Sequence, residues 1–376
     1  MQGLTLIGSG WHPYLFRAEI KALTGPLEVI HPRVVYIPHT DSAIRRLSRA
    51  ALLDEVLSSA GRIWLHSSIT DGELAQHIAE WAGSNLPEGS FAVRARKLGT
   101  GIDGLSRSAI EADVGAQVMS EANPVDLESP EHEIVVVLAG QDDGPIHRDS
   151  MNFIGPKVVW GLRESAWQRE SYAGRAPTER PFFRPVSLDA RQARLLISLA
   201  HRAGVESATV VDPFCGTGGI ALEAALQGME ALASDLDGRM VEGTRQNLDW
   251  AGVSASVEEC AVADVASVWG QRSGCVFVFD PPYGRSSWKS DDGLELFLTA
   301  LSAAHQIDSN GAVCTMLPAG PEALSQDPEH DYQVMGRPWS ELDGLIRERG
   351  WVPVLRTPVK VHRSLARMVV VCHPAD

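Results

Sequence analysis

Strand-length apolar runs alternate with helical patterns throughout the second half of the chain. The runs predicted as strands cover residues 209–214, 230–235, 256–263, 275–279 and 311–317. The patterns predicted as helices cover residues 217–227, 238–251 and 294–307. Because strand and helix alternate, we expect a mostly parallel, doubly wound α/β sheet. Two later extended segments, 351–360 and 366–373, predict an antiparallel hairpin that closes this sheet.

The first 160 residues follow a different pattern. Helical patterns cover residues 13–23 and 42–59, and strand patterns cover 34–37, 62–65, 91–97 and 133–138. These elements are consistent with one or two small α+β units. Residues 162–180 hold few aliphatic side chains and predict a linker to the second half.

The composition is typical of a soluble globular protein. Of the 376 residues, 44% are hydrophobic and 22% are charged, and this length suits two or three domains. The longest apolar runs are far shorter than the roughly 20 residues of a membrane-spanning helix. The first residues carry no pattern of a secretory signal. We therefore expect a cytoplasmic protein without a membrane partner.

The net charge of −15 works against binding of nucleic acid, because an acidic protein repels phosphates through its overall field. A nucleic-acid partner therefore requires a local basic surface. Residues 148–194 provide one basic stretch, with nine lysines or arginines against five acidic residues.

The five cysteines and twelve histidines carry no metal-ligand spacing. Because no C-x-x-C pair is present, the pattern argues against both a disulfide framework and a zinc site. Cys215 has no histidine beside it in the sequence to act as a base, which favours a small buried thiol over a nucleophile. We expect buried thiols and no bound metal.

A glycine-rich turn follows the first strand of the predicted sheet, in the run Asp-Pro-Phe-Cys-Gly-Thr-Gly-Gly at 212–219. Gly216, Gly218 and Gly219 lie between strand and helix, where a side chain would block the approach of a ligand to the backbone. The turn therefore predicts a site for a nucleotide-like ligand. The alternative is a tight strand-to-helix turn that binds nothing.

Carboxylates lie at the ends of three predicted strands. Asp235 ends the second strand, where a carboxylate binds the ribose hydroxyls of a nucleoside. Asp212 suits the amino group of a ligand, which favours a methionine-bearing cofactor over a pyrophosphate. Asp264 follows the third strand, either as an acceptor for an adenine amino group or as a helix N-cap. With Phe214 and Leu236 beside them, these residues predict a site for S-adenosylmethionine.

The run Asp280-Pro281-Pro282-Tyr283 follows the apolar strand 275–279. Two prolines stiffen the backbone, so the Asp280 carboxylate and the Pro281 carbonyl hold fixed positions. Two fixed acceptors for the hydrogens of an aromatic amino group turn its lone pair toward a methyl sulfonium. Tyr283 is positioned to stack on the base. The run predicts in-line methyl transfer to an exocyclic amino nitrogen, and the alternative is a proline turn that closes a strand.

Five segments of the second half match the pattern of a single enzyme family. They are Arg-Pro-Phe-Phe-Arg-Pro (180–185), the turn 212–219, Ser-Asp-Leu-Asp-Gly-Arg-Met-Val (234–241), Asp-Pro-Pro-Tyr-Gly-Arg-Ser-Ser (280–287) and Val-His-Arg-Ser-Leu-Ala-Arg (361–367). With these segments the chain resembles the archaeal tRNA guanosine-10 N2-methyltransferases. Residues 280–287 discriminate most, because amino-methyltransferases in general share only the first four. Ala366 departs from the pattern, which has a hydroxyl residue there.

This resemblance implies a Rossmann-fold methyltransferase domain over residues 181–376. It implies that S-adenosylmethionine donates one or two methyl groups to N2 of guanosine 10 in tRNA. Residues 91–97, 125–130 and 133–138 are similar to a THUMP domain, which would cover residues 52–161 and follow a ferredoxin-like region over 1–51.

The family further implies recognition of folded tRNA by shape, with one guanine swung out into the pocket. Shape recognition needs basic residues only on the surface that faces RNA, which reconciles a tRNA partner with the net charge. The resemblance implies phosphate contacts from Arg94, Arg96, Lys97, Arg285 and Arg363. For Arg94, Arg96 and Lys97 the alternative is a solvated strand edge.

Rival hypotheses keep the chemistry and change the substrate. They are another tRNA or ribosomal RNA guanosine, and adenine or cytosine in DNA. A rival of another class is a non-catalytic tRNA-binding protein with a relic pocket, against which the intact Asp235, Asp280 and Tyr283 count. We expect a monomer, and nothing in the sequence requires a protein partner.

Overall fold

The computed structural model describes residues 3–65, 69–141, 155–185, 187–205, 208–282, 291–324, 330–362 and 365–375. The chain divides into two compact units. The first unit comprises Met1–Ser48 and Leu52–Arg169, and the second comprises Arg49–Ala51 and Glu170–Asp376. In the described part of the chain, no helix is long and apolar enough to cross a membrane.

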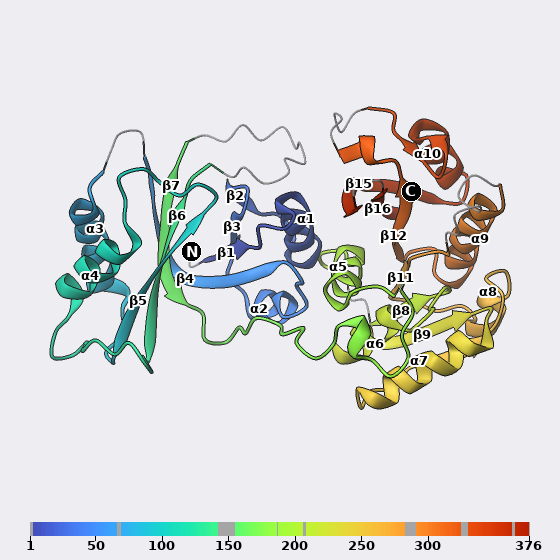
Figure 1. Ribbon diagram of the computed structural model, residues 1–376, viewed down its shortest axis with the longest axis horizontal. Coiled ribbons are helices and arrows are strands. Elements are labelled where there is room, and N and C mark those ends of the chain that lie inside the picture. Colours follow the sequence, from blue (N-terminus) through green and yellow to red (C-terminus); the bar gives the residue numbers. More distant parts are fainter. Residues whose placement is uncertain are drawn as a thin grey trace. The chain divides into compact units, whose positions relative to one another are not determined.

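The described strands of the first unit form one sheet with the order β2-β3-β1-β4-β7-β6-β5. All neighbours are antiparallel except β5 and β6, which are parallel. The elements are β1 (Gly3–Gly8), α1 (Pro13–Thr24), β2 (Glu28–His31), β3 (Val34–Pro38), α2 (Asp41–Leu47), β4 (Leu53–Trp64), α3 (Asp71–Asn85), β5 (Phe91–Leu98), α4 (Arg107–Val118), β6 (His132–Ala139) and β7 (Lys157–Arg163). Helices α3 and α4 pack against one face of β5, β6 and β7 through a buried apolar cluster (Figure 1).

The prediction of a helix over 42–59 is wrong beyond Leu47. The apolar residues of 52–57 follow helical spacing, yet the chain enters β4 at Leu53. There β4 pairs with β1 on one side and with β7 on the other, so the pairing of distant strands overrides the local pattern. Because of this strand, the segments on both sides of the predicted boundary at residues 51 and 52 belong to one sheet.

The second unit contains a sheet with the order β10-β9-β8-β11-β12, in which these five strands are parallel. β16 then pairs antiparallel with β12, and β15 pairs antiparallel with β16. The main elements are α5 (Ala190–Ala200), β8 (Thr209–Asp212), α6 (Gly219–Leu226), β9 (Glu230–Asp235), α7 (Gly238–Trp250), β10 (Ser256–Glu259), α8 (Val265–Trp269), β11 (Cys275–Phe279), α9 (Asp291–Ile307), β12 (Ala312–Ala319), β13 (Gln333–Val334), β14 (Arg337–Pro338), α10 (Trp339–Arg347), β15 (Trp351–His362) and β16 (Leu365–Pro374). The predicted fold class, a mostly parallel Rossmann-like sheet with a closing hairpin, is confirmed.

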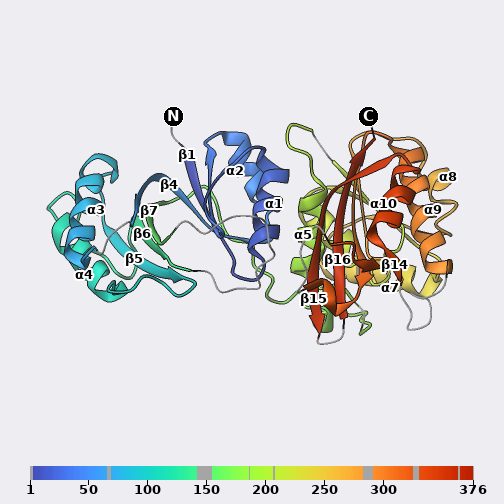
Figure 2. The same cartoon turned by 90° about the horizontal axis from the view of Figure 1, so that it is seen from above.

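Helices cover both faces of the second sheet. Figure 2 shows α5 on one side of the hairpin β15–β16 and α9 and α10 on the other. Side chains of α8, α9 and α10 pack with β11, β12 and β16 in a large apolar cluster that includes Phe277, Phe279, Phe297 and Trp351. The strand order reverses between β8 and β11, and ligands of open α/β sheets bind beside such a switch point at the carboxyl ends of the strands.

The predicted third strand is shorter than expected. β10 ends at Glu259, and residues 262–264 form a turn in which the Asp264 N–H donates to the Ala261 carbonyl at 2.9 Å. β10 pairs only with β9, and the last backbone hydrogen bond to that strand runs from the Cys260 N–H to the Asp235 carbonyl at 3.1 Å, so residues 261–263 continue no ladder among the described strands. The apolar residues of 260–263 instead line the wall of a cavity.

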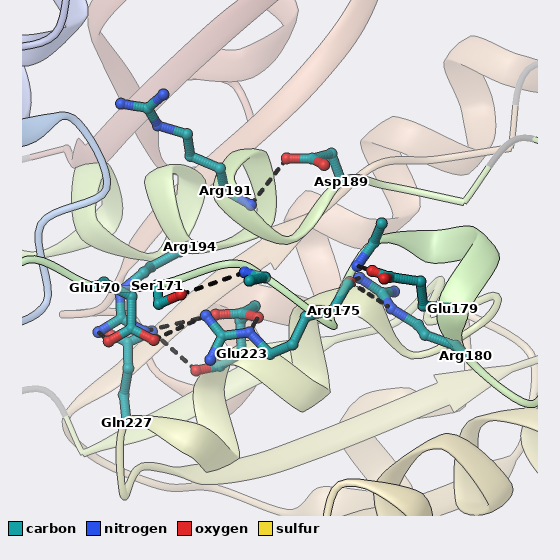
Figure 3. A network of polar contacts seen from close by, with 12 residues as sticks. Glu170, Ser171, Arg175, Glu179, Arg180, Asp189, Arg191, Arg194, Glu223 and Gln227 are labelled. Carbon is teal, nitrogen blue, oxygen red and sulfur yellow. Dashed lines mark hydrogen bonds and ion pairs between the residues drawn. The ribbon is translucent and has the colours of Figure 1, made fainter.

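The predicted linker, residues 162–180, overlaps with ordered structure at both ends. β7 continues to Arg163, and the chain from Glu170 onward belongs to the second unit. Figure 3 shows how this segment is anchored: Arg175 pairs with Glu170 at 2.8 Å and with Glu223 of α6 at 3.3 Å. Arg194 of α5 pairs with the same two carboxylates at 3.4 and 3.5 Å.

Candidate active site

A cavity of about 790 Å³ lies at the carboxyl ends of β8, β9 and β11 in the second unit. Its lining combines the glycine-rich turn, the ends of these strands, the turn after β10, one side of α9 and Arg367 of β16. Six carboxylates line it, from Asp212, Asp235, Asp237, Asp280, Asp292 and Glu295. Among the described lining residues only Arg184 and Arg367 are cationic, so the cavity favours a positively charged ligand.

The glycine-rich turn is held by the neighbouring strand. The Gly216 N–H donates to Oδ2 of Asp235 at 2.9 Å, and Gly216 has a φ of +52°. Gly216 and Gly219 line the cavity. Gly218 is described but does not line it; its φ is +78°, and a Cβ there would come within 2.6 Å of Thr244. Its glycine is therefore explained by the backbone turn and by helix packing.

Asp235 is fixed by two backbone hydrogen bonds. Besides the Gly216 N–H, the Asp237 N–H donates to its Oδ1 at 2.9 Å. A carboxylate oxygen accepts more than one hydrogen bond, so both oxygens keep capacity for ligand hydroxyls. Leu236, the next residue, is 75% exposed and lines the same cavity.

Asp264 stands apart from the other predicted ligand residues. It is exposed at the N-cap position of α8, its side chain makes no capping hydrogen bond, and the lining at this point comes from residues 260–263 instead. Of the two roles predicted for Asp264, the structure places it at the N-cap position without a side-chain cap, and the contact with an adenine stays a prediction.

Asp212 is buried at 2% exposure at the end of β8 and lines the cavity floor with Phe214. Its Oδ1 accepts the Phe214 N–H at 3.1 Å. Burial raises the pKa of Asp212 well above its usual range, and the charges of Asp235 and Asp280 add to that rise while the Phe214 N–H opposes it. The Phe214 ring in turn packs edge-on against Phe279, at 5.8 Å between centroids.

Asp280, Pro281 and Pro282 lie where β11 ends and line the cavity. Oδ2 of Asp280 accepts a hydrogen bond from Nη1 of Arg367, and burial raises the pKa of Asp280 while the Arg367 guanidinium opposes the rise. Tyr283, predicted to stack on the base, lies outside the described residues. The ion pair to Arg367 was not predicted, although Arg367 ends one of the five family segments; no local pattern connects two residues 87 positions apart.

One wall of the cavity comes from the segment before α5, through Arg184, Ser187 and Leu188. Asn247 of α7 fixes this segment: its amide donates to the Phe182 and Thr217 carbonyls at 2.9 Å, and its Oδ1 accepts the Phe182 N–H at 2.9 Å. Sequence reasoning did not assign this wall to the site, although residues 180–185 were among the family segments.

The predicted RNA-contact residues of the first unit carry ion pairs. Arg94 pairs with Glu133 at 3.1 Å and Arg96 pairs with Glu55 at 2.9 Å, whereas Lys97 is exposed. Both arginines remain partly exposed, at 40% and 32% of their side chains. Arg285 and Arg363 lie outside the described residues.

The five cysteines are free thiols, buried except for the half-buried Cys260. Burial raises the pKa of the Cys215 thiol far above its usual range, so Cys215 is held as a neutral thiol in the turn. Among the described residues, no group of three or more His, Cys, Asp or Glu side chains is arranged to hold a metal ion.

The second unit has a Rossmann-like sheet with a closing hairpin. A glycine-rich turn bonded to Asp235 and an Asp-Pro-Pro run line the same cavity. These features define a methyltransferase of the Rossmann-fold class. Residues 177–331 match the family model described as "RMKL-like, methyltransferase domain". The tRNA (guanine(10)-N2)-dimethyltransferase of Methanothermobacter thermautotrophicus is 31% identical over 328 residues, which cover 86% of this chain and 82% of that relative. The chain belongs to the family of the tRNA (guanine(10)-N2)-dimethyltransferases.

Two further relatives carry similar names. The tRNA (guanine(10)-N2)-dimethyltransferase of Pyrococcus abyssi is 29% identical over 69% of this chain and 71% of its own length. The tRNA (guanine(10)-N(2))-methyltransferase of Mus musculus is 29% identical over 43% of this chain and 38% of its own length.

Proposed function

We propose that this enzyme transfers methyl groups from S-adenosylmethionine to the exocyclic N2 of guanosine 10 in tRNA. The observation that carries the proposal is the Asp280 carboxylate at the wall of a cofactor-sized cavity, because its Oδ1 is buried and has no hydrogen-bond partner among the described residues. The identity of the substrate is inferred from the relatives, which are named as tRNA (guanine(10)-N2)-dimethyltransferases.

The residues of the cavity fit S-adenosylmethionine. Its volume is in the range of roughly 300–1,000 Å³ that small-molecule sites occupy. The excess of carboxylates suits a ligand that carries a sulfonium and an ammonium group. In this arrangement Asp235 binds the ribose hydroxyls, Asp212 binds the amino group, and Leu236 and Phe214 contact the apolar surface. Asp264 is exposed, so it accepts a hydrogen bond from the adenine amino group only if the adenine lies at the outer rim of the cavity. When bound, the cofactor supplies a methyl group on a cationic sulfur.

Asp280 and Pro281 supply the acceptors for the substrate. The Asp280 carboxylate and the Pro281 carbonyl accept hydrogen bonds from the amino group, which directs the nitrogen lone pair toward the methyl carbon. With S-adenosylmethionine bound, the amino nitrogen held by Asp280 and Pro281 would accept the methyl group, and the electrons of the broken S–C bond would stay on sulfur. The proton of the methylated nitrogen passes to Asp280 or to water. Tyr283 stacks on the guanine.

The first unit is proposed to bind the tRNA, with a THUMP domain over 52–161 after a ferredoxin-like region. Lys97 and the exposed parts of Arg94 and Arg96 are the described candidates for phosphate contacts. Because their ion pairs anchor Arg94 and Arg96 at the sheet, we expect them to position RNA with little rearrangement. Arg285 and Arg363 are the candidates in the second unit.

The test uses an unmodified tRNA transcript with guanosine at position 10 and a matched transcript with adenosine there. After incubation with enzyme and S-adenosylmethionine, nucleosides are identified by mass spectrometry, which also counts the methyl groups. We expect N2-methylated guanosine from the first transcript only. Equal methylation of both transcripts would move the target to another guanosine. Ribosomal RNA and duplex DNA are incubated in parallel, and methylation of either of these alone would replace tRNA as the substrate.

A matched pair of variants tests the chemistry. Asp280→Asn loses the charged acceptor, so its rate should fall by about 100-fold or more while S-adenosylmethionine still binds. Asp343→Asn removes a carboxylate from a surface ion pair of α10 and should leave the rate unchanged. Full activity of Asp280→Asn would refute the assignment, and tRNA binding without turnover in any form would favour the non-catalytic rival.

A further inference from the structure

Arg367 approaches Asp280 from a strand that is not its neighbour. It lies on β16, and β12 separates β16 from β11, so the two backbones are about 10 Å apart. Ala366 and Met368 on either side of Arg367 are buried in the apolar cluster, and side chains of a strand alternate between its faces. Arg367, which pairs with Pro318 of β12, therefore points away from that cluster and lines the cavity.

The two oxygens of Asp280 differ in their surroundings. Oδ2 accepts the hydrogen bond from Arg367, whereas Oδ1 is buried and has no hydrogen-bond partner among the described residues. Buried carboxylate oxygens are almost always paired, because an unpaired one loses its hydration without compensation. An oxygen of this kind beside a ligand cavity is explained by a donor that arrives with the substrate.

Among the described charges around Asp280, the neighbouring carboxylates disfavour its ionised form and the contacting Arg367 favours it. Asp212 on β8 repels it, since the charge of Asp280 contributes to the raised pKa of Asp212. Asp235 on β9 and the α9 carboxylates Asp292 and Glu295 line the same cavity, and the other lining cation is Arg184 on the opposite wall segment. Arg367 is the cation in direct contact with Asp280.

We propose that Arg367 is a positioning residue for the methyl transfer: it holds Asp280 by Oδ2, so that Oδ1 is presented as an ionised acceptor for the amino group. This inference rests on the proposed function. It differs from a purely structural ion pair, because it requires that Arg367 control both the orientation and the charge of the acceptor.

Two substitutions and one control test the role in catalysis. In Arg367→Gln we expect kcat at neutral pH to fall by about 10- to 100-fold, because a misplacement of a reacting group by about 1 Å can cost about 100-fold in rate. KM for tRNA and the affinity for S-adenosylmethionine should change little. Because Asp280 then ionises less readily, the acid limb of the rate profile should move to higher pH, and activity should partly recover in alkaline buffer. For Arg367→Lys we expect a kcat and a pH profile between those of the wild type and those of Arg367→Gln.

The control is Arg347→Gln, which removes a surface ion pair of α10 with Asp343 and should behave as the wild type. A wild-type rate and pH profile in Arg367→Gln would overturn the proposal. So would a loss of rate that is equal at every pH and accompanied by a lower melting temperature, since that pattern indicates a structural role.

A measurement without substrate separates this inference from the proposed function. Carboxyl-13C NMR of aspartate-labelled protein follows the titration of Asp280, with its resonance assigned from Asp280→Asn. We expect the Asp280 midpoint to be higher in Arg367→Gln than in the wild type. An equal midpoint would overturn the proposal. If the wild type methylates no tRNA, the proposed function fails, while this titration still decides whether Arg367 controls the charge of Asp280.

Discussion

Gly243 in α7 faces Phe182, and a single methyl group there should disturb the wall of the active site. A Cβ at Gly243 would lie 2.0 Å from Cδ1 of Phe182, far inside van der Waals contact. Phe182 belongs to the wall segment before α5, and Asn247 bonds its N–H and its carbonyl. The Arg184 guanidinium lies over the Phe182 ring, 5.0 Å from its centroid, and Arg184 lines the cavity.

The size of the effect follows from two opposing contributions. Replacing glycine by alanine inside a helix stabilises the helix by about 1 kcal/mol. Forcing a methyl group into a packed contact costs about 1–3 kcal/mol, because Phe182 is held by its backbone bonds and must leave its place. For Gly243→Ala we expect a net loss of about 0–2 kcal/mol.

Gly344 in α10 provides the matched control, since it also lies inside a helix and a Cβ there would meet no atom within 4 Å. Gly344→Ala should therefore raise stability, and the two variants should differ by about 1–3 kcal/mol, several degrees in melting temperature. Thermal unfolding followed by circular dichroism measures this difference, and calorimetry measures the expected loss of S-adenosylmethionine affinity in Gly243→Ala. Adding Phe182→Leu should restore part of the stability. Equal melting temperatures for Gly243→Ala and Gly344→Ala would refute the reasoning.

Two further predictions concern buried carboxylates. Burial raises the pKa of Asp212 in the folded state. At pH values between the usual aspartate pKa and this raised pKa, the folded state therefore binds more protons than the unfolded state. The free energy of unfolding falls as pH rises through this range. Asp212→Asn should therefore resist urea better than the wild type at neutral pH, with no advantage near pH 4, and an advantage that does not change with pH would contradict this. Glu223 pairs with Arg175 and with the buried Arg194, so Glu223→Gln should lower the free energy of unfolding by about 3 kcal/mol. Denaturation beside the exposed control Glu242→Gln checks this, and equal stability of the two would show that the pairs contribute little.

The elements of the second sheet were predictable because each depends on a local pattern. β9 and β11 have the predicted bounds, since each contains at least four consecutive buried residues between turn signals. The positions of the glycine-rich turn, Asp235 and Asp280 at strand ends were predictable for the same reason, because they follow from the chain order of the fold. In the first unit, the helical spacing of residues 52–57 gave a wrong prediction of a helix. These residues lie in or beside β4, which is stabilised by pairing with β1 and β7.

What the sequence determined by itself is therefore the alternation of strands and helices and the chemical groups at the strand ends. The tertiary structure decided which of those groups work together. The latch between Asp235 and Gly216, the wall segment held by Asn247 and the contact of Arg367 with Asp280 all join positions distant in the chain. Such contacts depend on the order of the strands in the sheet, and a local spacing does not encode that order.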